Sequence, residues 1–387
     1  MPFTSKRYRV FVLGAGFSSP AGLPLGVDLW RQILKRTRSM SGRAEKFYQD
    51  LHSYIDFRKE CDGVILTPEE VDFEDFLGFL DVEHYLGLRG SDTWSEDGNE
   101  AQVVVKTLIG QILVESTPKK EEIPSLYLNF AKALQPGDHV ITFNYDVLLE
   151  RAMEAVRKPF RLFPTRFTRV TKSHAEYEIS DEEVVILKVH GSIDWFDRRR
   201  HRELEDHYFQ QGLLSGPNHP VFSRTRELDA VPLLEGPRFD HDPLCEMWRV
   251  RNAEELYRTF PLFRATPWLL NPSSAKILYS SKLKDFWYGL GDAGILNFGL
   301  AIIGFSLSEH DRYTRQILYG LVKNYQTQYW GEEVLGGLKK TPLVLIDLRK
   351  TPEEKEAFKR RYAFVDLDKT ICKLDGFNDT ALSILFE

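Results

Sequence analysis

The chain has 387 residues, 42% of them hydrophobic and 13% aromatic, which is enough to fill a sizeable core and more than one ordinary domain. Its net charge of −6 excludes a general electrostatic attraction to nucleic acid or to an anionic membrane. Cys61, Cys245 and Cys372 stand far apart, which excludes a four-cysteine zinc ribbon and argues against a disulfide scaffold. Neither a signal peptide nor a membrane-spanning run is present in the sequence, so we expect a cytoplasmic protein.

Apolar runs without polar alternation predict strands that are buried on both faces of a parallel sheet. These runs are Tyr8–Leu13, Val140–Phe143, Val184–Val189, Leu300–Phe305 and Leu343–Leu348. Helical periodicity between them predicts helices at Phe73–Leu88, Leu148–Val156 and Tyr313–Tyr325. The alternation of strands and helices predicts the α/β class with a Rossmann-like parallel sheet.

The spacing of the predicted strands is uneven. Roughly 125 residues separate the first from the second, far more than a simple crossover needs. We therefore expect a sheet domain made of residues 1–28, 135–194 and 273–387, with an inserted helical module at 29–134. Residues 195–272 are predicted to be a smaller insertion or a set of long loops, whose histidines, such as His201, we expect at the surface.

The first strand runs into Gly14-Ala15-Gly16, a sequence that permits a tight turn and a close approach of the backbone to a diphosphate. As a dehydrogenase fingerprint it is incomplete, because Ser19 and Pro20 stand where the third glycine belongs. On its own, the motif could be a simple turn.

Further polar or glycine-bearing motifs follow three other predicted strands. They are Asn144-Tyr145-Asp146, His190-Gly191 and Gly304-Phe305-Ser306. In an open parallel sheet, ligands bind beyond the carboxyl ends of the strands. The four motifs together predict one binding site at that edge.

The stretches GAGFSSPAGLPLG, FNYD, KVHGS and IIGFSLSEHD resemble the sirtuin fold, in the branch of bacterial sirtuin-like proteins tied to antiphage defence. The resemblance covers roughly residues 7–26, 138–194 and 296–350, and VDFEDFLGFLDVE is similar to part of that branch's helical insertion. It implies NAD as the bound molecule. The implied contacts are Gly14, Ala15, Gly16, Phe17 and Ser18 with the diphosphate, Asn144, Asp146 and His190 near the nicotinamide ribose, and Gly304 and Ser306 with the adenosine half.

Two departures from the deacylating sirtuins imply a different reaction. The chain lacks the two cysteine pairs of their zinc module, and Leu23–Asp28 replaces the proline, phenylalanine and arginine that follow their glycine loop. Both departures point away from protein deacylation and toward NAD hydrolysis, with no metal ion.

The chemistry of the residues agrees with hydrolysis. A neutral asparagine, Asn144, can orient a water by donating and accepting hydrogen bonds, and His190 can accept a proton from it. Nicotinamide is already a cationic leaving group, so its departure needs no general acid. Alternatives remain open: His190 could cap its strand, Asn144 could form a turn, and Asp146 and the His310-Asp311 pair could cap helices. Ser18 and Ser19 could cap the next helix and contact the phosphate at the same time.

We therefore predict an NAD glycohydrolase that forms nicotinamide and ADP-ribose and depletes NAD in an antiphage complex. A catalytically inert NAD or ADP-ribose scaffold is the alternative, and a protein deacylase or ADP-ribosyltransferase is a weaker one. The resemblance implies a homo-oligomer with a HerA-type ATPase or a short Argonaute-type partner. Because the glycine loop is assigned to the diphosphate, we expect Gly16→Val to block NAD binding and to leave the fold largely intact.

Overall fold

The computed structural model of the chain divides into two compact units. It describes residues 8–40, 42, 44–90, 98–178, 182–213, 219–222, 228–259, 266–271, 283–309, 311–334 and 337–386. Residues 1–25, 117–190 and 283–387 form the first unit, and residues 26–116 and 191–282 form the second. Segments 29–116 and 195–272 of the two predicted insertions thus belong to one compact unit.

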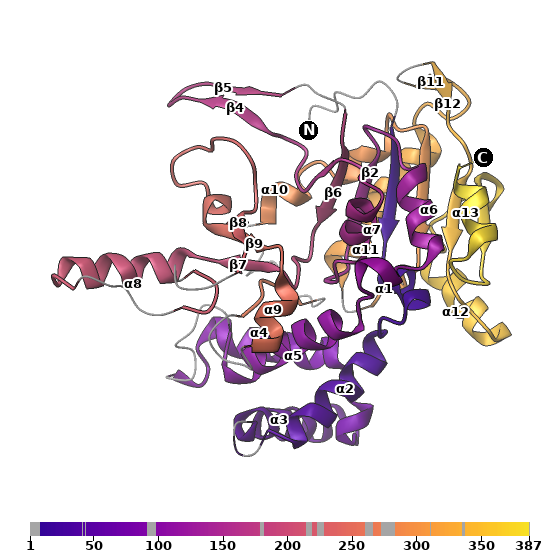
Figure 1. Cartoon of the computed structure of the whole chain (residues 1–387). Helices are drawn as coiled ribbons and strands as arrows, with labels where there is room; N and C mark the ends of the chain where they lie inside the picture. The colour runs from indigo at the N-terminus through magenta and orange to yellow at the C-terminus, as the bar shows by residue number, and fades with distance from the viewer. Residues whose placement is uncertain are drawn as a thin grey trace. The chain divides into compact units, whose positions relative to one another are not determined.

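A parallel sheet of seven strands forms the centre of the first unit (Figure 1). Its strands are β1 (Arg9–Leu13), β2 (His139–Thr142), β3 (Phe160–Arg161), β6 (Val184–Lys188), β10 (Gly299–Ile303), β13 (Leu343–Ile346) and β14 (Thr370–Lys373). The longer helices are α6 (Ser125–Ala133), α7 (Leu148–Ala155), α11 (Arg312–Thr327), α12 (Pro352–Arg361) and α13 (Asp379–Phe386), with the short α1 (Ala15–Ser18) and α10 (Lys284–Trp287). Two small hairpins pair β4 (Phe167–Val170) with β5 (Ala175–Tyr177), and β11 (Glu333–Val334) with β12 (Leu338–Lys339).

The strand order is β14-β13-β10-β1-β2-β6-β3, and each neighbouring pair is parallel. The predicted α/β class with a parallel sheet is therefore confirmed. Strand β1 lies in the middle of the sheet, with β2 on one side and β10 on the other. Later strands of the chain therefore extend the sheet on both sides of β1. This is the kind of switch point at which open parallel sheets bind ligands.

All five predicted strands and all three predicted helices are confirmed to within two residues at either end. The sequence interpretation missed the two edge strands, β3 and β14. Strand β3 has only two residues, and β14 is partly exposed along its whole length, so neither has the apolar run of a buried strand.

Aromatic side chains pack helices α6 and α13 onto β1. The Phe11 ring lies 5.6 Å from the Phe130 ring of α6 and 5.6 Å from the Phe386 ring of α13. Phe11 and Phe130 are both fully buried. Burial of such side chains stabilises a fold by about 1.5–3 kcal/mol each.

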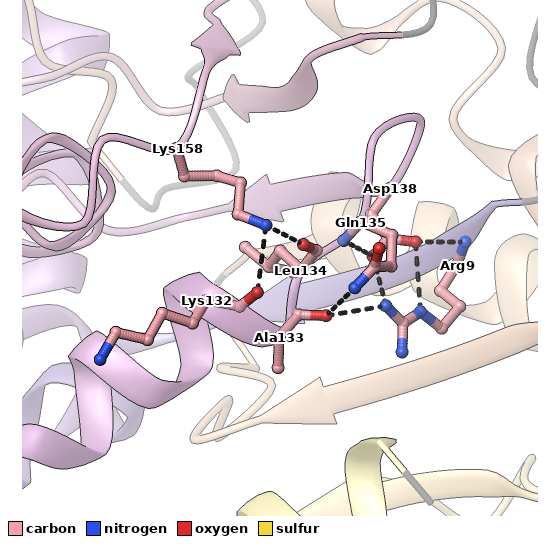
Figure 2. A network of polar contacts seen from close by, with 7 residues as sticks. All are labelled: Arg9, Lys132, Ala133, Leu134, Gln135, Asp138 and Lys158. Carbon is pink, nitrogen blue, oxygen red and sulfur yellow. Dashed lines mark hydrogen bonds and ion pairs between the residues drawn. The ribbon is translucent and has the colours of Figure 1, made fainter.

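Charged side chains join the elements at the amino end of the sheet, as Figure 2 shows. Arg9 donates to both carboxylate oxygens of Asp138 and, at 3.3 Å, to the carbonyl oxygen of Ala133. Lys158 donates to the carbonyl oxygens of Lys132 and Leu134. These cations satisfy the last carbonyl groups of α6, where a positive charge is favourable.

The second unit contains helices and a three-stranded antiparallel sheet. The helices are α2 (Gly26–Arg38), α3 (Glu45–Asp62), α4 (Phe73–Leu86), α5 (Glu100–Ser116), α8 (Arg199–Gln210) and α9 (Ala253–Thr259). The sheet has the order β7 (Trp195–Asp197), β9 (Met247–Val250), β8 (Ala230–Pro232). Trp30 of α2, Phe47 of α3 and Phe76 of α4 are buried against one another and form its aromatic core.

One histidine of this unit contradicts the sequence interpretation. We expected His201 at the surface, but its side chain is buried. Its ring stacks on Phe222 at 5.7 Å and lies 5.0 Å from the ring of His219. This residue of the polar helix α8 is buried because His219 and Phe222 pack against it, which helical periodicity alone does not reveal. No helix in the described ranges combines the length and the apolar character that crossing a membrane would require.

Candidate functional site

The carboxyl ends of four neighbouring strands lie in register. Leu13, the last residue of β1, pairs with Thr142 of β2 and with Ile303 of β10, and Thr142 pairs with Lys188 of β6. The loops after these strands therefore start side by side. They carry the glycine motif, Asn144 and Asp146, His190, and Gly304 and Ser306, so the predicted residues come from adjacent strand ends.

The glycine loop packs directly on the loop that follows β10. The amide of Gly14 donates to the carbonyl oxygen of Ile303 (2.9 Å), and the amide of Gly16 donates to that of Gly304 (2.8 Å). A Cβ at Gly16 would lie 2.7 Å from the Cα of Gly304, and one at Gly14 would lie 2.5 Å from the Gly304 oxygen. Gly304 has a φ of +62° and is equally crowded. All three positions thus require glycine for loop packing.

This packing overturns the expectation for Gly16→Val. A valine side chain at this position would meet backbone atoms, which cannot rotate away, so the variant would disturb the fold as well as any bound molecule.

The backbone amides of the glycine loop are largely engaged within the protein. Besides those of Gly14 and Gly16, the amide of Phe17 donates to the carbonyl oxygen of Gly14 (2.9 Å). The Phe17 side chain is buried against Tyr127, Phe130 and Phe377. Ala15, in contrast, is exposed. A diphosphate at this loop would therefore meet Ala15 and backbone rather than the Phe17 ring.

Asn144 follows β2 and ties its loop to the glycine loop. Its side-chain nitrogen donates to the carbonyl oxygen of Gly14 (2.9 Å) and lies 3.3 Å from the hydroxyl of Ser18. Because a carbonyl oxygen accepts hydrogen bonds only, this contact fixes which end of the amide is nitrogen. Within the described residues, the side-chain hydrogen bonds of Asn144 are all made by that nitrogen.

Asp146 belongs to a buried polar network. Its Oδ1 accepts a hydrogen bond from the amide of Leu148, the first residue of α7 (3.0 Å). The N-cap position is Val147 and not Asp146, one residue later than the sequence interpretation proposed. Burial raises the pKa of Asp146, and the nearby charge of Lys188, the Leu148 amide and the Ser18 hydroxyl oppose that rise. Lys188 itself is fully buried, donates to the carbonyl oxygen of Asp146, and pairs with Glu150 of α7 at 2.8 Å. The network joins the glycine loop, the loop after β2 and the end of β6.

His190 lies two residues beyond β6 and is buried among aromatic rings. The ring centroids of Phe143, Trp287 and Tyr145 lie 5.0, 5.9 and 6.3 Å from that of His190. Its Nε2 lies 3.4 Å from Oδ2 of Asp311. Asp311 also caps α11, as predicted, because its carboxylate accepts from the amide of Thr314 (3.0 Å). His310, the other residue of that predicted pair, lies outside the described residues.

The loop after β10 accepts hydrogen bonds from two side chains at the end of α12, Arg361 and the C-cap residue Tyr362. Ser306 is exposed, and its carbonyl oxygen accepts from Arg361 at 3.3 Å. The Tyr362 hydroxyl donates to the carbonyl oxygen of Phe305 (2.8 Å).

Asp347, directly after β13, extends the row of polar strand ends and was not singled out from the sequence. Burial raises its pKa, and Arg349 at 2.9 Å opposes that rise. A polar residue near the end of the fifth predicted strand, Leu343–Leu348, was the signal that could have found it.

Among the described residues, no group of three or more histidine, cysteine or acidic side chains could hold a metal ion. The roles assigned to the individual site residues stay predictions.

A search for related proteins gives one family match and several solved structures. Residues 138–224 match the family model of the SIR2-like domain. This segment includes Asn144, Asp146 and His190. The match supports a sirtuin-like family. No curated protein matches the chain.

Solved structures of sirtuins are among those similar to the chain. They include one from work on the structural basis of sirtuin substrate affinity (12% identity, 98% of this chain and 93% of that chain covered, TM-score 0.33). Another is Sir2Tm bound to a propionylated peptide (12%, 98% and 90%, TM-score 0.31). A third is SIR2 with the inhibitor EX-527, 2′-O-acetyl-ADP-ribose and a deacetylated p53 peptide (12%, 98% and 91%, TM-score 0.36).

Proposed function

We propose that the chain hydrolyses NAD to nicotinamide and ADP-ribose at the carboxyl edge of its parallel sheet. One observation carries the proposal: an oriented amide, Asn144, and a buried imidazole, His190, follow two strands that pair in register, within the segment that matches the SIR2-like domain. Attack by a water molecule requires two groups: an amide that orients the water and a base that accepts its proton.

In the proposed reaction, a water attacks C1′ of the nicotinamide ribose. The C1′–N bond breaks, its electron pair neutralises the pyridinium ring, and nicotinamide leaves. His190 accepts the proton that the water loses, and Asn144 orients the water with its Oδ1, since its nitrogen is held by Gly14. Positioning and proton transfer each contribute about 10²–10⁴-fold to such a rate.

The remaining residues would hold the substrate. The exposed Ala15 and the neighbouring backbone would meet the diphosphate, and the loop of Gly304 and Ser306 would meet the adenosine half. Asp146 would contact the ribose in addition to accepting from the amide of Leu148. These assignments follow the resemblance and the adjacency of the strand ends.

The biological role that we propose is NAD depletion in an antiphage response. A homo-oligomer, with a HerA-type ATPase or a short Argonaute-type partner, would keep the enzyme silent until it is triggered. The activity assay is therefore run both with and without candidate partners.

The test is to incubate the purified full-length protein with NAD and to follow nicotinamide and ADP-ribose by chromatography. Wild-type protein should release both, and His190→Ala and Asn144→Ala should each lower turnover by at least about 10²-fold. Because both residues act on one step, the double variant should be little worse than either single one.

NAD binding without nicotinamide release in every combination would favour the inert scaffold. Nicotinamide release that requires an acylated peptide would favour deacylation. Full turnover in both single variants would contradict the mechanism proposed here.

A further inference from the structure

We propose that Asp311 is a positioning residue for His190: its carboxylate fixes the imidazole and stabilises the charge that the ring gains when it accepts a proton. The proposal rests on the proposed hydrolase function and names a residue for which the sequence interpretation favoured a helix cap.

The contact joins two buried side chains that are far apart in the sequence. Nε2 of His190 lies 3.4 Å from Oδ2 of Asp311, and each side chain is only 3% exposed. A carboxylate in this position favours the tautomer that carries its proton on Nε2, which leaves Nδ1 as the proton acceptor.

Asp311 is itself held rigidly. Its Oδ1 accepts from the amide of Thr314 (3.0 Å), and its Oδ2 accepts from the Thr314 hydroxyl (2.6 Å). Both contacts come from the first turn of α11, so the carboxylate cannot swing away from the imidazole without breaking the helix cap. The helix therefore sets the place of the negative charge relative to His190.

The surroundings make that charge important for the reaction. Phe143, Tyr145 and Trp287 surround the His190 ring, and aromatic neighbours solvate an imidazolium far less well than water does. A fixed negative charge at 3.4 Å offsets this penalty. The imidazole becomes charged only as the water is deprotonated, so the benefit appears in the transition state and not in NAD binding.

Capping and positioning can be separated by one substitution. Asparagine caps helices as well as aspartate does, so Asp311→Asn keeps an acceptor for the amide of Thr314. It removes the negative charge and replaces the acceptor that faces Nε2 of His190 with an amide nitrogen, which only donates. We expect kcat to fall by about 10²-fold or more while KM for NAD and the thermal midpoint change little. The matched control is Asp72→Asn at the cap of α4, where the side chain accepts from the amides of Glu74 and Asp75. It should keep full turnover.

An unchanged kcat in Asp311→Asn, measured beside an active wild type, would overturn the positioning role and leave the hydrolase function standing. No turnover in the wild type with any partner would instead overturn the hydrolase function itself. If Asp72→Asn loses as much kcat as Asp311→Asn, the loss comes from weaker helix capping, and the proposal is overturned as well.

A second measurement covers the case in which Asp311→Asn does not fold. Nitrogen-15 spectra of histidine-labelled wild-type protein report the tautomer of each ring, and the His190 signals are those that disappear in His190→Gln. The proposal requires a proton on Nε2 of His190. A proton on Nδ1 alone in the neutral ring would contradict it.

Discussion

The side-chain nitrogen of Asn144 donates a hydrogen bond of 2.9 Å to the carbonyl oxygen of Gly14, and so joins the loops that follow β2 and β1. This bond gives Asn144 two roles. It stabilises the glycine loop, and it turns the other end of the amide away from Gly14, where it can accept a hydrogen bond from water.

Asn144→Asp should therefore impair both stability and turnover. The substitution replaces the donor with a carboxylate oxygen that faces a carbonyl oxygen, so we expect the free energy of unfolding to fall by about 1–3 kcal/mol. We also expect turnover to fall by at least about 10²-fold, because the oriented amide is lost. Denaturant unfolding and the nicotinamide assay measure the two effects.

A matched substitution separates the two roles. Asn324 makes the same kind of bond, from its nitrogen to the carbonyl oxygen of Gly291 (3.0 Å), outside the site. Asn324→Asp should lower stability and leave turnover intact. If Asn144→Asp behaves in the same way, Asn144 is structural only.

Gly16→Ala should destabilise the fold even when no NAD is present. Its Cβ would lie 2.7 Å from the Cα of Gly304, a distance that real Cβ atoms do not tolerate, so one of the two loops must shift. Overpacking of this kind costs about 1–3 kcal/mol. Thermal unfolding of the free protein measures the loss.

The control for Gly16→Ala is Gly320→Ala in the middle of α11. A Cβ there would meet the Cα of Gly291 at 3.7 Å, an ordinary contact, and alanine favours the helix by up to about 1 kcal/mol. We expect an unchanged or raised midpoint. Equal stability of Gly16→Ala and wild type would show that the loops have room, and would return the glycine to a binding role.

The sequence predicted the sheet and the edge at which the candidate site lies. Apolar runs identify strands buried on both faces, and the polar residues directly after them must meet at one edge of a parallel sheet. Asn144, His190 and Gly304 come together for that reason. Their adjacency needs no knowledge of side-chain packing.

The contacts that these residues make could not be predicted in the same way. Gly16 must be glycine because its loop packs on Gly304, and His190 faces Asp311. Both partners lie more than a hundred residues away in the chain. A sequence pattern reports the face or edge on which a residue lies. It does not report which other segment packs against that residue. His201 was wrongly expected at the surface because the sequence pattern does not show that His219 and Phe222 pack against it.

His139, at the start of β2, should make stability depend on pH. Burial lowers its pKa from 6.5 to about 4. Between these values the unfolded chain binds a proton that the folded chain does not, so the free energy of unfolding should fall as the pH drops from about 7 to 4. The contribution is at most about 3 kcal/mol.

The pH test compares His139→Gln with the wild type by denaturant unfolding at several pH values. The variant should lose part of the decline between pH 6.5 and 4, while His52→Gln on the exposed side of α3 should keep it. Parallel curves for wild type and His139→Gln would contradict the assignment.

Lys188→Met should be among the most destabilising single substitutions in the first unit. Lys188 and Glu150 are both buried and lie 2.8 Å apart, and the ammonium also donates to the carbonyl oxygen of Asp146. Removal of one partner leaves the Glu150 charge uncompensated, which costs about 3–5 kcal/mol. Lys188 is the last residue of β6, pairs with Thr142 of β2 and precedes His190 by two residues, so turnover should fall as well.

The double variant Lys188→Met/Glu150→Leu tests the physical reason. With both charges removed, no ion is left unpaired, so much of the lost stability should return, as it does when buried ion pairs are replaced by apolar residues. Arg36→Met, which breaks the partly exposed pair with Glu115, should cost no more than about 1 kcal/mol. Denaturant unfolding of Lys188→Met, Glu150→Leu and the double variant, compared with wild type, completes the double-mutant cycle. Arg36→Met is measured beside them as the control. If the double variant is as unstable as the sum of the two single ones, Lys188 acts through its bond to Asp146 and not through its pairing with Glu150.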